Sequence, residues 1–391
     1  MSEIVPTNPP PISMDDLEYR EKPLHKLTKP KHNHTIIGWD TETYKGYAKL
    51  IANSRGETLI IEKQEESKET LIRILRFLTR KSLRDTFGFF YNLTFDFGAI
   101  FKYGGKEILH KLVYEGEVEI GEFKVRYIEK KAFTIIRGKR SFHFFDAFQY
   151  FQMSLENASK IYLNEHKLLD LVDRERLNDD LSYWHKNLPL IKKYCIKDAQ
   201  LTARLMEMLQ EWFKSFMGFP PKNYISTASV SKQYFRTKCE IPIACDFPKG
   251  VVEYATYAYH GGRFEDLLRG YLGHCYLIDI NSSYPFAMTQ LKAYPKDAWI
   301  RTDGIKYEDT HGFYFVEVDV PDNLYIAPFP FRTRTGNIYP SGVFRTWVTK
   351  EEILAFDNIT DITIIDGWEA RGEGEFIYKD IIPVSYTHLT L

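Results

Sequence analysis

Apolar and polar positions follow two periods along this chain. Short apolar runs and alternating apolar residues predict strands at 35–39, 87–91, 123–127, 142–144 and 314–320. Apolar residues three or four positions apart predict amphipathic helices over 66–78 and 183–216. Strands interspersed with helices in this order predict an α/β (α+β) fold.

Two of the predicted strands lead directly to acidic residues. Strand 35–39 is expected to end at Asp40, with Glu42 two residues further on, and strand 87–91 is followed closely by Asp96. Residues two apart in a strand share a face, so the carboxylates of Asp40 and Glu42 point the same way. Two like charges side by side are unfavourable unless a cation lies between them.

The helix predicted over 183–216 carries another carboxylate on its apolar side. Pro189 suits a first helical turn, and the Gly- and Pro-containing segment 218–222 ends the helix at a plausible domain boundary. Asp198 lies one turn after Tyr194, beside a leucine stripe formed by Leu201, Leu205 and Leu209. A buried carboxylate needs a partner, and a metal ion is the simplest one given the other acids.

A further acidic residue is expected at a strand end in the second half of the chain. The apolar run 276–278 predicts a buried strand that delivers Asp279 to its tip. The polar residues 281–283 then predict a turn, and Tyr284 with the following proline opens a helix.

The composition is that of an ordinary globular protein. The 391 residues are 44% hydrophobic and 27% charged with a formal net charge of -1, and the length suits two to three domains. The neutral balance neither supports nor excludes a nucleic-acid partner, because affinity depends on local neutralisation of phosphates. The four cysteines contain no C-x-x-C pair, which predicts a reducing compartment and no zinc site. No signal peptide and no apolar run of roughly 18 residues is present, so we expect a cytoplasmic protein without a membrane partner.

Charge and proline content distinguish two other segments. Residues 1–31 are rich in proline and charge and predict a flexible tail. Between Lys124 and Arg140 seven basic residues accompany a single acid, Glu129. A ribbon that contacts phosphates and the solvent side of a sheet explain this run equally well.

The four acids Asp40, Glu42, Asp96 and Asp198 suit a two-metal centre. Converging carboxylates can hold two divalent ions about 4 Å apart, which generate hydroxide and stabilise the leaving 3′ oxygen of a phosphodiester. Oxygen ligands favour Mg²⁺ or Mn²⁺. The hydroxyl of Tyr194 can both donate and accept, so it can orient the attacking water or relay a proton.

The order of these residues resembles the proofreading 3′-5′ exonuclease of family B DNA polymerases, a ribonuclease H-like domain with a mixed sheet. Its three motifs match Asp-Thr-Glu at 40–42, Asn-Leu-Thr-Phe-Asp at 92–96 and Tyr-x-x-x-Asp at 194–198. The resemblance implies catalytic roles for Asp40, Glu42, Asp96, Asp198 and Tyr194. It also implies that the single-stranded 3′ end is bound by Thr43, Asn92 and Phe95.

A second set of motifs resembles the polymerase part of the same family. Asp-x-x-Ser-x-Tyr-Pro at 279–285 matches the motif whose Asp holds catalytic Mg²⁺ and whose Tyr packs on the sugar of the incoming nucleotide. This implies metal binding by Asp279 and nucleotide binding by Asp279, Ser282, Ser283 and Tyr284. A preceding Tyr-x-Gly-Gly element narrows the resemblance to the protein-primed branch of bacteriophages and linear plasmids. It implies DNA binding by Tyr259, Gly261 and Gly262.

The protein-primed resemblance divides the chain into regions and suggests partners. We expect an exonuclease domain at 32–217, the start of a palm at 218–289 and a terminal-protein-binding insertion at 290–382. The implied partners are a single-stranded 3′ end and primer-template DNA, a dNTP in the intact enzyme, and a terminal priming protein. The implied location is the cytoplasm of a host cell.

Two features of the family, a DNA-binding motif and a lysine that assists catalysis, each have two candidate positions in this sequence. The segment after Asp146 lacks the hydroxyl of the Ser/Thr-Leu DNA-binding motif, whereas Ser154-Leu155 fits but lies later. The lysine that assists exonucleolysis matches either Lys167 or Arg174.

Family motifs expected beyond Asp279 are missing. Neither the nucleotide-binding helix nor the Asp-Thr-Asp hairpin follows it, so we do not expect polymerisation from this chain alone. Residues 383–391 resemble a translated sequencing adapter and predict a non-native tail after a truncated reading frame. Two alternatives stay open: a free-standing 3′-5′ exonuclease, and a non-catalytic scaffold that binds DNA or a priming protein.

Overall fold

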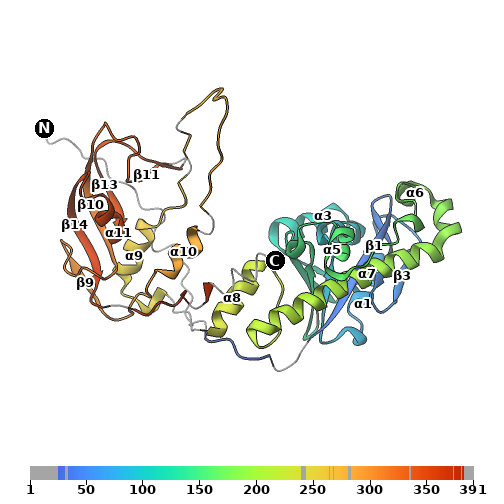
Figure 1. Ribbon diagram of the computed structural model, residues 1–391. Helices are drawn as coiled ribbons and strands as arrows, with labels where there is room; N and C mark the ends of the chain where they lie inside the picture. Colours follow the sequence, from blue (N-terminus) through green and yellow to red (C-terminus); the bar gives the residue numbers. More distant parts are fainter. Residues whose placement is uncertain are drawn as a thin grey trace. The chain divides into compact units, whose positions relative to one another are not determined.

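The computed structural model describes residues 25–30, 34–238, 244–263, 265–266, 268–280, 283–333, 336–372, 374–379 and 381–382. Contacts divide them into one compact unit over Leu27–Thr237 and a second that contains the residues from Lys238 onward (Figure 1). The division falls later than the expected boundary at 218–222. Among the described residues, no helix combines the length and apolar character needed to cross a membrane.

A mixed sheet forms the centre of the first unit. Its strands are β1 (Thr35–Tyr44), β2 (Tyr47–Asn53), β3 (Thr58–Ile60), β4 (Thr86–Phe90), β5 (Glu117–Ile120), β6 (Phe123–Ile128), β7 (Ala132–Arg137) and β8 (Arg140–Asp146). They lie in the order β3-β2-β1-β4-β8-β7-β6-β5 within the described residues. The pairs β1–β4 and β4–β8 are parallel and the others are antiparallel, which confirms the predicted α/β fold with a mixed sheet.

Helices connect and cover these strands. They are α1 (Lys68–Leu78), α2 (Leu93–Phe101), α3 (Gly105–His110), α4 (Phe148–Phe151), α5 (Leu155–Leu163), α6 (Arg174–Asp179), α7 (Leu181–Met217) and α8 (Thr227–Lys238), with short turns η2 (Lys81–Leu83), η3 (Lys102–Gly104), η4 (Lys111–Glu115) and η5 (Leu169–Leu171). The predicted helices over 66–78 and 183–216 correspond to α1 and α7. Pro189 lies inside α7 and not in its first turn, because the Asp180 side chain caps the helix earlier by accepting from the Tyr183 N–H.

Close packing of α7 on β1 brings the functional segments together. A Cβ at Gly38 would collide with the main chain of Ala199 and Ala203, so glycine allows the helix to lie directly on the strand. The opposite side of the sheet carries the larger core, in which Leu71 and Leu75 of α1 belong to the same buried cluster as Trp39. The strand and helix that carry the acidic motifs are therefore held by buried packing.

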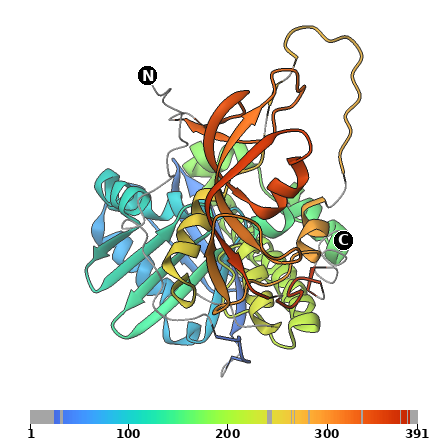
Figure 2. The ribbon, with the colours of Figure 1, turned by 90° about the vertical axis from the view of Figure 1, so that its left-hand side faces the viewer.

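A smaller antiparallel sheet organises the second unit. Its strands β9 (Trp299–Thr302), β10 (Gly312–Val320), β13 (Gly342–Thr349) and β14 (Asp361–Ala370) lie in the order β13-β10-β14-β9, and β11 (Phe331–Thr333) pairs with β12 (Gly336–Ile338). The accompanying helices are η6 (Ala244–Asp246), α9 (Lys249–Ala258), α10 (Ser283–Thr289) and α11 (Lys350–Phe356). Figure 2 shows these strands in orange and red. Helix α11 packs against β10 and β13. The predicted alternation at 314–320 matches β10, whose apolar side chains are buried.

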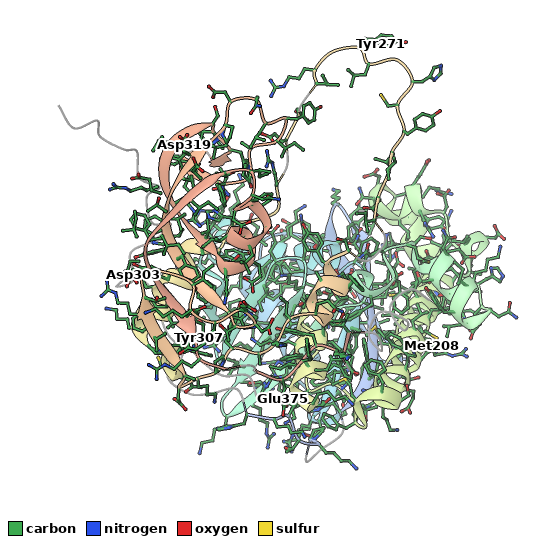
Figure 3. All side chains as sticks on the ribbon, turned by 60° about the vertical axis from the view of Figure 1, so that its left-hand side comes forward. Met208, Tyr271, Asp303, Tyr307, Asp319 and Glu375 are labelled. Carbon is green, nitrogen blue, oxygen red and sulfur yellow. The ribbon has the colours of Figure 1, made fainter. Side chains whose placement is uncertain are left out.

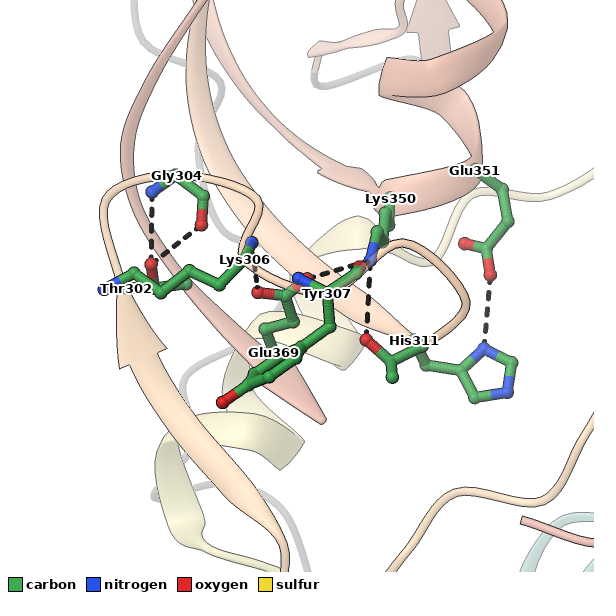
Figure 4. A network of polar contacts seen from close by, with 9 residues as sticks. Thr302, Gly304, Lys306, Tyr307, His311, Lys350, Glu351 and Glu369 are labelled. Atoms are coloured by element: carbon green, nitrogen blue, oxygen red, sulfur yellow. Dashed lines mark hydrogen bonds and ion pairs between the residues drawn. The ribbon is translucent and has the colours of Figure 1, made fainter. Parts of the chain in front are cut away.

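A buried ion pair fastens a loop to this sheet. Lys350 Nζ lies 2.8 Å from Glu369 Oε1, and the two side chains are 1% and 0% exposed. The Glu369 carboxylate also accepts from the main-chain N–H groups of Lys306 and Tyr307, at 2.8 and 3.1 Å (Figure 4). Every oxygen of the buried carboxylate thus has a donor.

The predicted strand at 276–278 is absent from the structure. Residues 268–280 form an extended segment without helix or strand, on which Leu277 is 100% and Tyr271 is 99% exposed (Figure 3). A strand requires a hydrogen-bonded neighbour, and among the described residues none pairs with this segment. The helix expected after it is present as α10.

The two ends predicted to lack a fold are only partly described. Of the expected tail at 1–31, residues 25–30 are described, and Leu27 is buried with its N–H donating to the Arg236 carbonyl at 2.7 Å. The first unit therefore includes residues before position 32. The predicted non-native tail at 383–391 lies outside the described residues.

Candidate active site

Asp40 and Glu42 reach the site from the middle of a strand. The sequence predicted a strand end at Asp40, but β1 continues to Tyr44 because it pairs with β2 through a bulge between Glu42 and Thr43. The carboxylates still lie on one side, as predicted, and both are half-buried. The structure brings potential ligand atoms of Asp40, Glu42 and Cys195 within 4.8 Å of one another.

Asp96 and Asp198 enter from two helices. Asp96 was expected at a strand end, but it lies in the first turn of α2, because the chain turns at Asn92 with a left-handed φ of 68° and starts the helix at once. Asp198 lies on the buried side of α7 with Tyr194, as the helical spacing predicted.

Direct contacts connect these acidic residues. The Thr41 hydroxyl donates to Asp96 Oδ1 at 2.7 Å. The ammonium of Lys167 pairs with Asp198 Oδ2; the Asp198 side chain is buried, and that of Lys167 is 14% exposed. Asp40 Oδ2 and Asp198 Oδ1 are buried and have no hydrogen-bond partner within the described part of the chain. Buried oxygens of this kind suit a cation, because an unpaired buried acceptor is costly.

Burial and mutual repulsion favour the protonated forms of these acids when no cation is present. Burial, followed by the charge of Asp198, raises the pKa of Asp40 to about 7. Burial and the charge of Asp40 raise the pKa values of Glu42 and Asp96 well above their ordinary range. Burial also raises the pKa of Asp198, while its ion pair with Lys167 opposes that effect. Divalent ions would reverse these shifts, since they stabilise the ionised forms.

The structure distinguishes between the two candidates for the assisting basic residue. Lys167 pairs with Asp198 directly, and its ammonium lies 5.2 Å from the centre of the Tyr194 ring. Arg174 lies over the same ring at 5.8 Å, and no ion pair joins it to an acid of the site among the described residues. The main-chain N–H of Lys167 donates to Oε2 of Glu156 at 2.7 Å. Glu156 belongs to α5, so this helix holds the lysine in place. This contact spans eleven residues and had no sequence signal.

Asp146 is a positioning residue that the sequence did not reveal. Its Oδ1 accepts from the main-chain N–H groups of Asn92, Leu93 and Phe148, at 3.0, 3.2 and 2.9 Å. The buried carboxylate therefore holds the turn that leads into Asp96. On the same turn Asn92 is exposed and Phe95 is 57% exposed, whereas Thr43 on β1 is half-buried.

The polymerase-like residues are not gathered into a comparable site. Asp279 is exposed on the extended segment, and Ser283 and Tyr284 are exposed in the first turn of α10. Ser282 lies outside the described residues. The one group of three or more potential metal ligands found in the described ranges does not include Asp279. Upstream, Tyr259, Gly261 and Gly262 are exposed beyond the end of α9.

Acids partly neutralise the basic run at 124–140. Glu117 pairs with both Lys124 and Arg126, and Glu122 pairs with Arg137. Both acids precede the run in sequence. Glu117 reaches it because β5 pairs with β6, and Glu122 reaches Arg137 because the neighbouring Phe123 pairs with Arg137 across β6 and β7. The pairing favours the solvent side of a sheet over a free phosphate-binding ribbon.

Comparisons with known proteins give a family match for part of the chain and a similar fold among solved structures. Residues 185–370 match the family described as DNA polymerase type B, organellar and viral. A comparison with curated proteins found no match. The chain is similar to Phi29 DNA polymerase in complex with primer-template DNA and incoming nucleotides, with a TM-score of 0.53, 16% identity and coverage of 90% of this chain and 63% of that one. Against the same polymerase with single-stranded DNA, the TM-score is 0.50 and the identity 16%, over 91% of this chain and 66% of that one.

This chain thus spans less than two thirds of the polymerase whose fold it shares. The similarity to solved structures shows the fold, and the family match indicates a relationship to type B DNA polymerases. Residues 185–370 match the organellar and viral type B DNA polymerases, and this match agrees with the resemblance to protein-primed family B polymerases that the motifs predicted.

Proposed function

We propose that this chain carries a two-metal 3′-5′ exonuclease that removes nucleotides from single-stranded DNA ends. One observation carries the proposal: acids from β1, α2 and α7 come close enough to raise one another's pKa, while buried oxygens of Asp40 and Asp198 have no partner among the described residues. Acids without a shared ligand would not be expected to gather at such an electrostatic cost.

The available side chains fit Mg²⁺ or Mn²⁺. Asp40, Glu42, Asp96 and Asp198 offer the oxygen ligands that these ions prefer. When bound, the ions would supply a hydroxide nucleophile and stabilise the leaving 3′ oxygen.

Other side chains would hold the water and the DNA. Burial and the charge of Asp198 raise the pKa of Tyr194, so its hydroxyl stays neutral and can orient the water. Lys167 pairs with Asp198 and favours its ionised form, which is the form that binds a metal ion. Thr43, Asn92 and Phe95 would bind the 3′ end, with the exposed ring of Phe95 available for stacking on a base.

We also propose that the whole protein is a protein-primed DNA polymerase that acts in replication. The family match over 185–370 supports this. Under this proposal Asp279 binds a catalytic metal ion, Tyr284 contacts the dNTP, and the second unit binds a terminal protein and duplex DNA. The expected setting is the cytoplasm of a cell that harbours a phage or linear plasmid. A single carboxylate cannot hold a two-metal site, so Asp279 requires further acidic ligands for polymerisation.

The exonuclease is tested with purified protein, Mg²⁺ and a single strand labelled at its 5′ end. We expect a ladder that shortens from the 3′ end and a loss of at least about 1000-fold when Asp40→Ala and Glu42→Ala are combined, as for removal of a catalytic metal site. Asp303→Ala removes an exposed carboxylate of the second unit and serves as the control. Equal degradation by the double variant and the wild type would reject the proposal. Binding of DNA without any degradation would favour the non-catalytic scaffold.

A further inference from the structure

The thiol of Cys195 lies among the acids of the proposed exonuclease site. Its side chain is 0% exposed, and Sγ donates to the main-chain oxygen of Asp40 at 3.5 Å. The Sγ atom and one carboxylate oxygen each from Asp40 and Glu42 lie within 4.8 Å of one another. Three potential ligands therefore already face a common point, although the sequence predicted no zinc site.

A second observation points to a cation at the same place. Asp198 lies three residues after Cys195 on α7, so the two side chains share one side of the helix. Asp198 is 3% exposed and its Oδ1 has no partner in the described chain. The proposed exonuclease site therefore contains buried oxygens, on Asp40 and Asp198, that lack a donor among the described residues.

We propose that Asp40, Glu42 and Cys195 bind one thiophilic divalent ion, Zn²⁺ by preference, as an alternative to Mg²⁺ in the proposed exonuclease site. The proposal rests on the same side chains as the exonuclease and specifies which metals they discriminate. A thiolate favours Zn²⁺ strongly over Mg²⁺, whereas carboxylates alone suit Mg²⁺. Two carboxylates and one thiolate leave one position of a tetrahedral zinc ion for water.

Binding requires little rearrangement. Oxygen and sulfur ligands of a tetrahedral zinc ion are roughly 3.3 to 3.5 Å apart, given a metal–oxygen distance of about 2.0 Å and a metal–sulfur distance of about 2.3 Å. Since the three atoms lie within 4.8 Å of one another, they must approach by at most roughly 1.5 Å. The thiol releases its proton to solvent as the sulfur binds the ion. The half-buried carboxylates of Asp40 and Glu42 leave a route for the ion from solvent.

The test measures metal binding directly in the full chain. Titration calorimetry with Zn²⁺ and with Mg²⁺ is performed on the wild type, Cys195→Ser and Cys275→Ser; Cys275 is exposed and outside the site. Loss of a direct ligand should weaken zinc binding by at least about 100-fold in Cys195→Ser, more than loss of an outer partner does. Magnesium affinity should stay within about twofold. Cys275→Ser should behave as the wild type in both titrations.

Cobalt supplies a spectroscopic signature of sulfur ligation. Co²⁺ bound to the wild type should show a near-ultraviolet sulfur-to-metal absorption band, absent from Cys195→Ser and retained in Cys275→Ser. Circular dichroism of each metal-free variant checks folding, and Cys195→Ala serves as a second variant if Cys195→Ser unfolds. Unchanged zinc affinity in the folded variant, or no thiolate band in the wild type, would overturn the proposal.

The result is separable from that of the proposed function. Exonuclease activity is measured with Mg²⁺ alone, whereas the zinc site is measured without DNA. Zinc binding that depends on Cys195 in a protein that leaves DNA intact supports this inference and rejects only the exonuclease. If the protein degrades DNA with Mg²⁺ but binds zinc equally well without Cys195, the exonuclease proposal is supported and the zinc proposal is rejected.

Discussion

The hydroxyl of Thr41 donates a 2.7 Å hydrogen bond to Oδ1 of Asp96, and this contact joins β1 to α2 across 55 residues of sequence. Thr41 is buried and lies between Asp40 and Glu42, so its side chain points to the opposite side of the strand from theirs. Thr41 thus connects Asp96 to the strand segment that carries Asp40 and Glu42.

Replacing this hydroxyl should destabilise the first unit. Thr41→Val keeps the shape of the side chain but leaves a buried carboxylate oxygen without its donor, which costs about 1–3 kcal/mol. Thr41→Ser retains a hydroxyl and should recover most of that loss. Unfolding in urea measures both variants against the wild type. Equal stability of Thr41→Val and the wild type would show that the bond contributes nothing.

Lys167 and Arg174 should differ in their importance for activity. Lys167→Met leaves Asp198 buried without its cation, and we expect an activity loss of roughly 10- to 100-fold, as for removal of other groups that orient a metal ligand. Arg174→Met removes a cation over the ring of Tyr194 whose charge acts on Asp198 without an ion pair, and it should cost less. Rates of 3′ degradation under single-turnover conditions compare the two variants. A larger loss in Arg174→Met would reverse the assignment.

The metal-free protein should lose stability as pH rises. Burial raises the pKa of Asp40 to about 7, so the folded state keeps a proton that the unfolded chain releases near pH 4. Between about pH 4 and 7 the folded state binds more protons, and its free energy of unfolding falls through this window. Above that window the loss contributed by Asp40 is complete. Melting in chelator at several pH values checks the direction.

Asp40→Asn and added Mg²⁺ are the controls for this pH dependence. The variant lacks the titrating group, so its melting temperature should fall less steeply with pH than that of the wild type. Mg²⁺ at pH 8 should raise the melting temperature of the wild type, because a ligand that binds only the folded state stabilises it. Parallel pH profiles for the two proteins would contradict the assignment.

The buried pair of Lys350 and Glu369 should matter more than an exposed pair on the same sheet. Lys350→Met leaves the Glu369 carboxylate buried without its cation and should destabilise the second unit by about 3–5 kcal/mol. Arg301, whose side chain is 69% exposed, pairs with Asp366 at 2.7 Å, and Arg301→Met should cost no more than about 1 kcal/mol. Denaturant unfolding monitored by tryptophan fluorescence tests both. Equal losses in the free energy of unfolding would show that burial does not determine how much these ion pairs stabilise the protein.

Local pattern determined most elements of the chain and which acids belong together. The apolar spacing of α1, α7 and β10 appears in the structure because each buries one side against a core, and burial selects a period that can be read along the sequence. The identities of Asp40, Glu42, Asp96 and Asp198 likewise follow from motifs within a few residues of each. The exposed segment before Asp279 is an apolar run that forms no strand, because an apolar run becomes a strand only where a neighbouring strand pairs with it.

Only the tertiary structure decided which other groups share the site. Cys195, Lys167 and Asp146 contact residues 155, 31 and 54 positions away, and such contacts depend on how α7, the segment after α5 and β8 pack. A thiol one residue after Tyr194 gives no sign in the sequence that it faces Asp40 across a helix–strand interface. The close approach permitted by Gly38 makes that contact possible, because main-chain distance and not residue order sets which ligands converge.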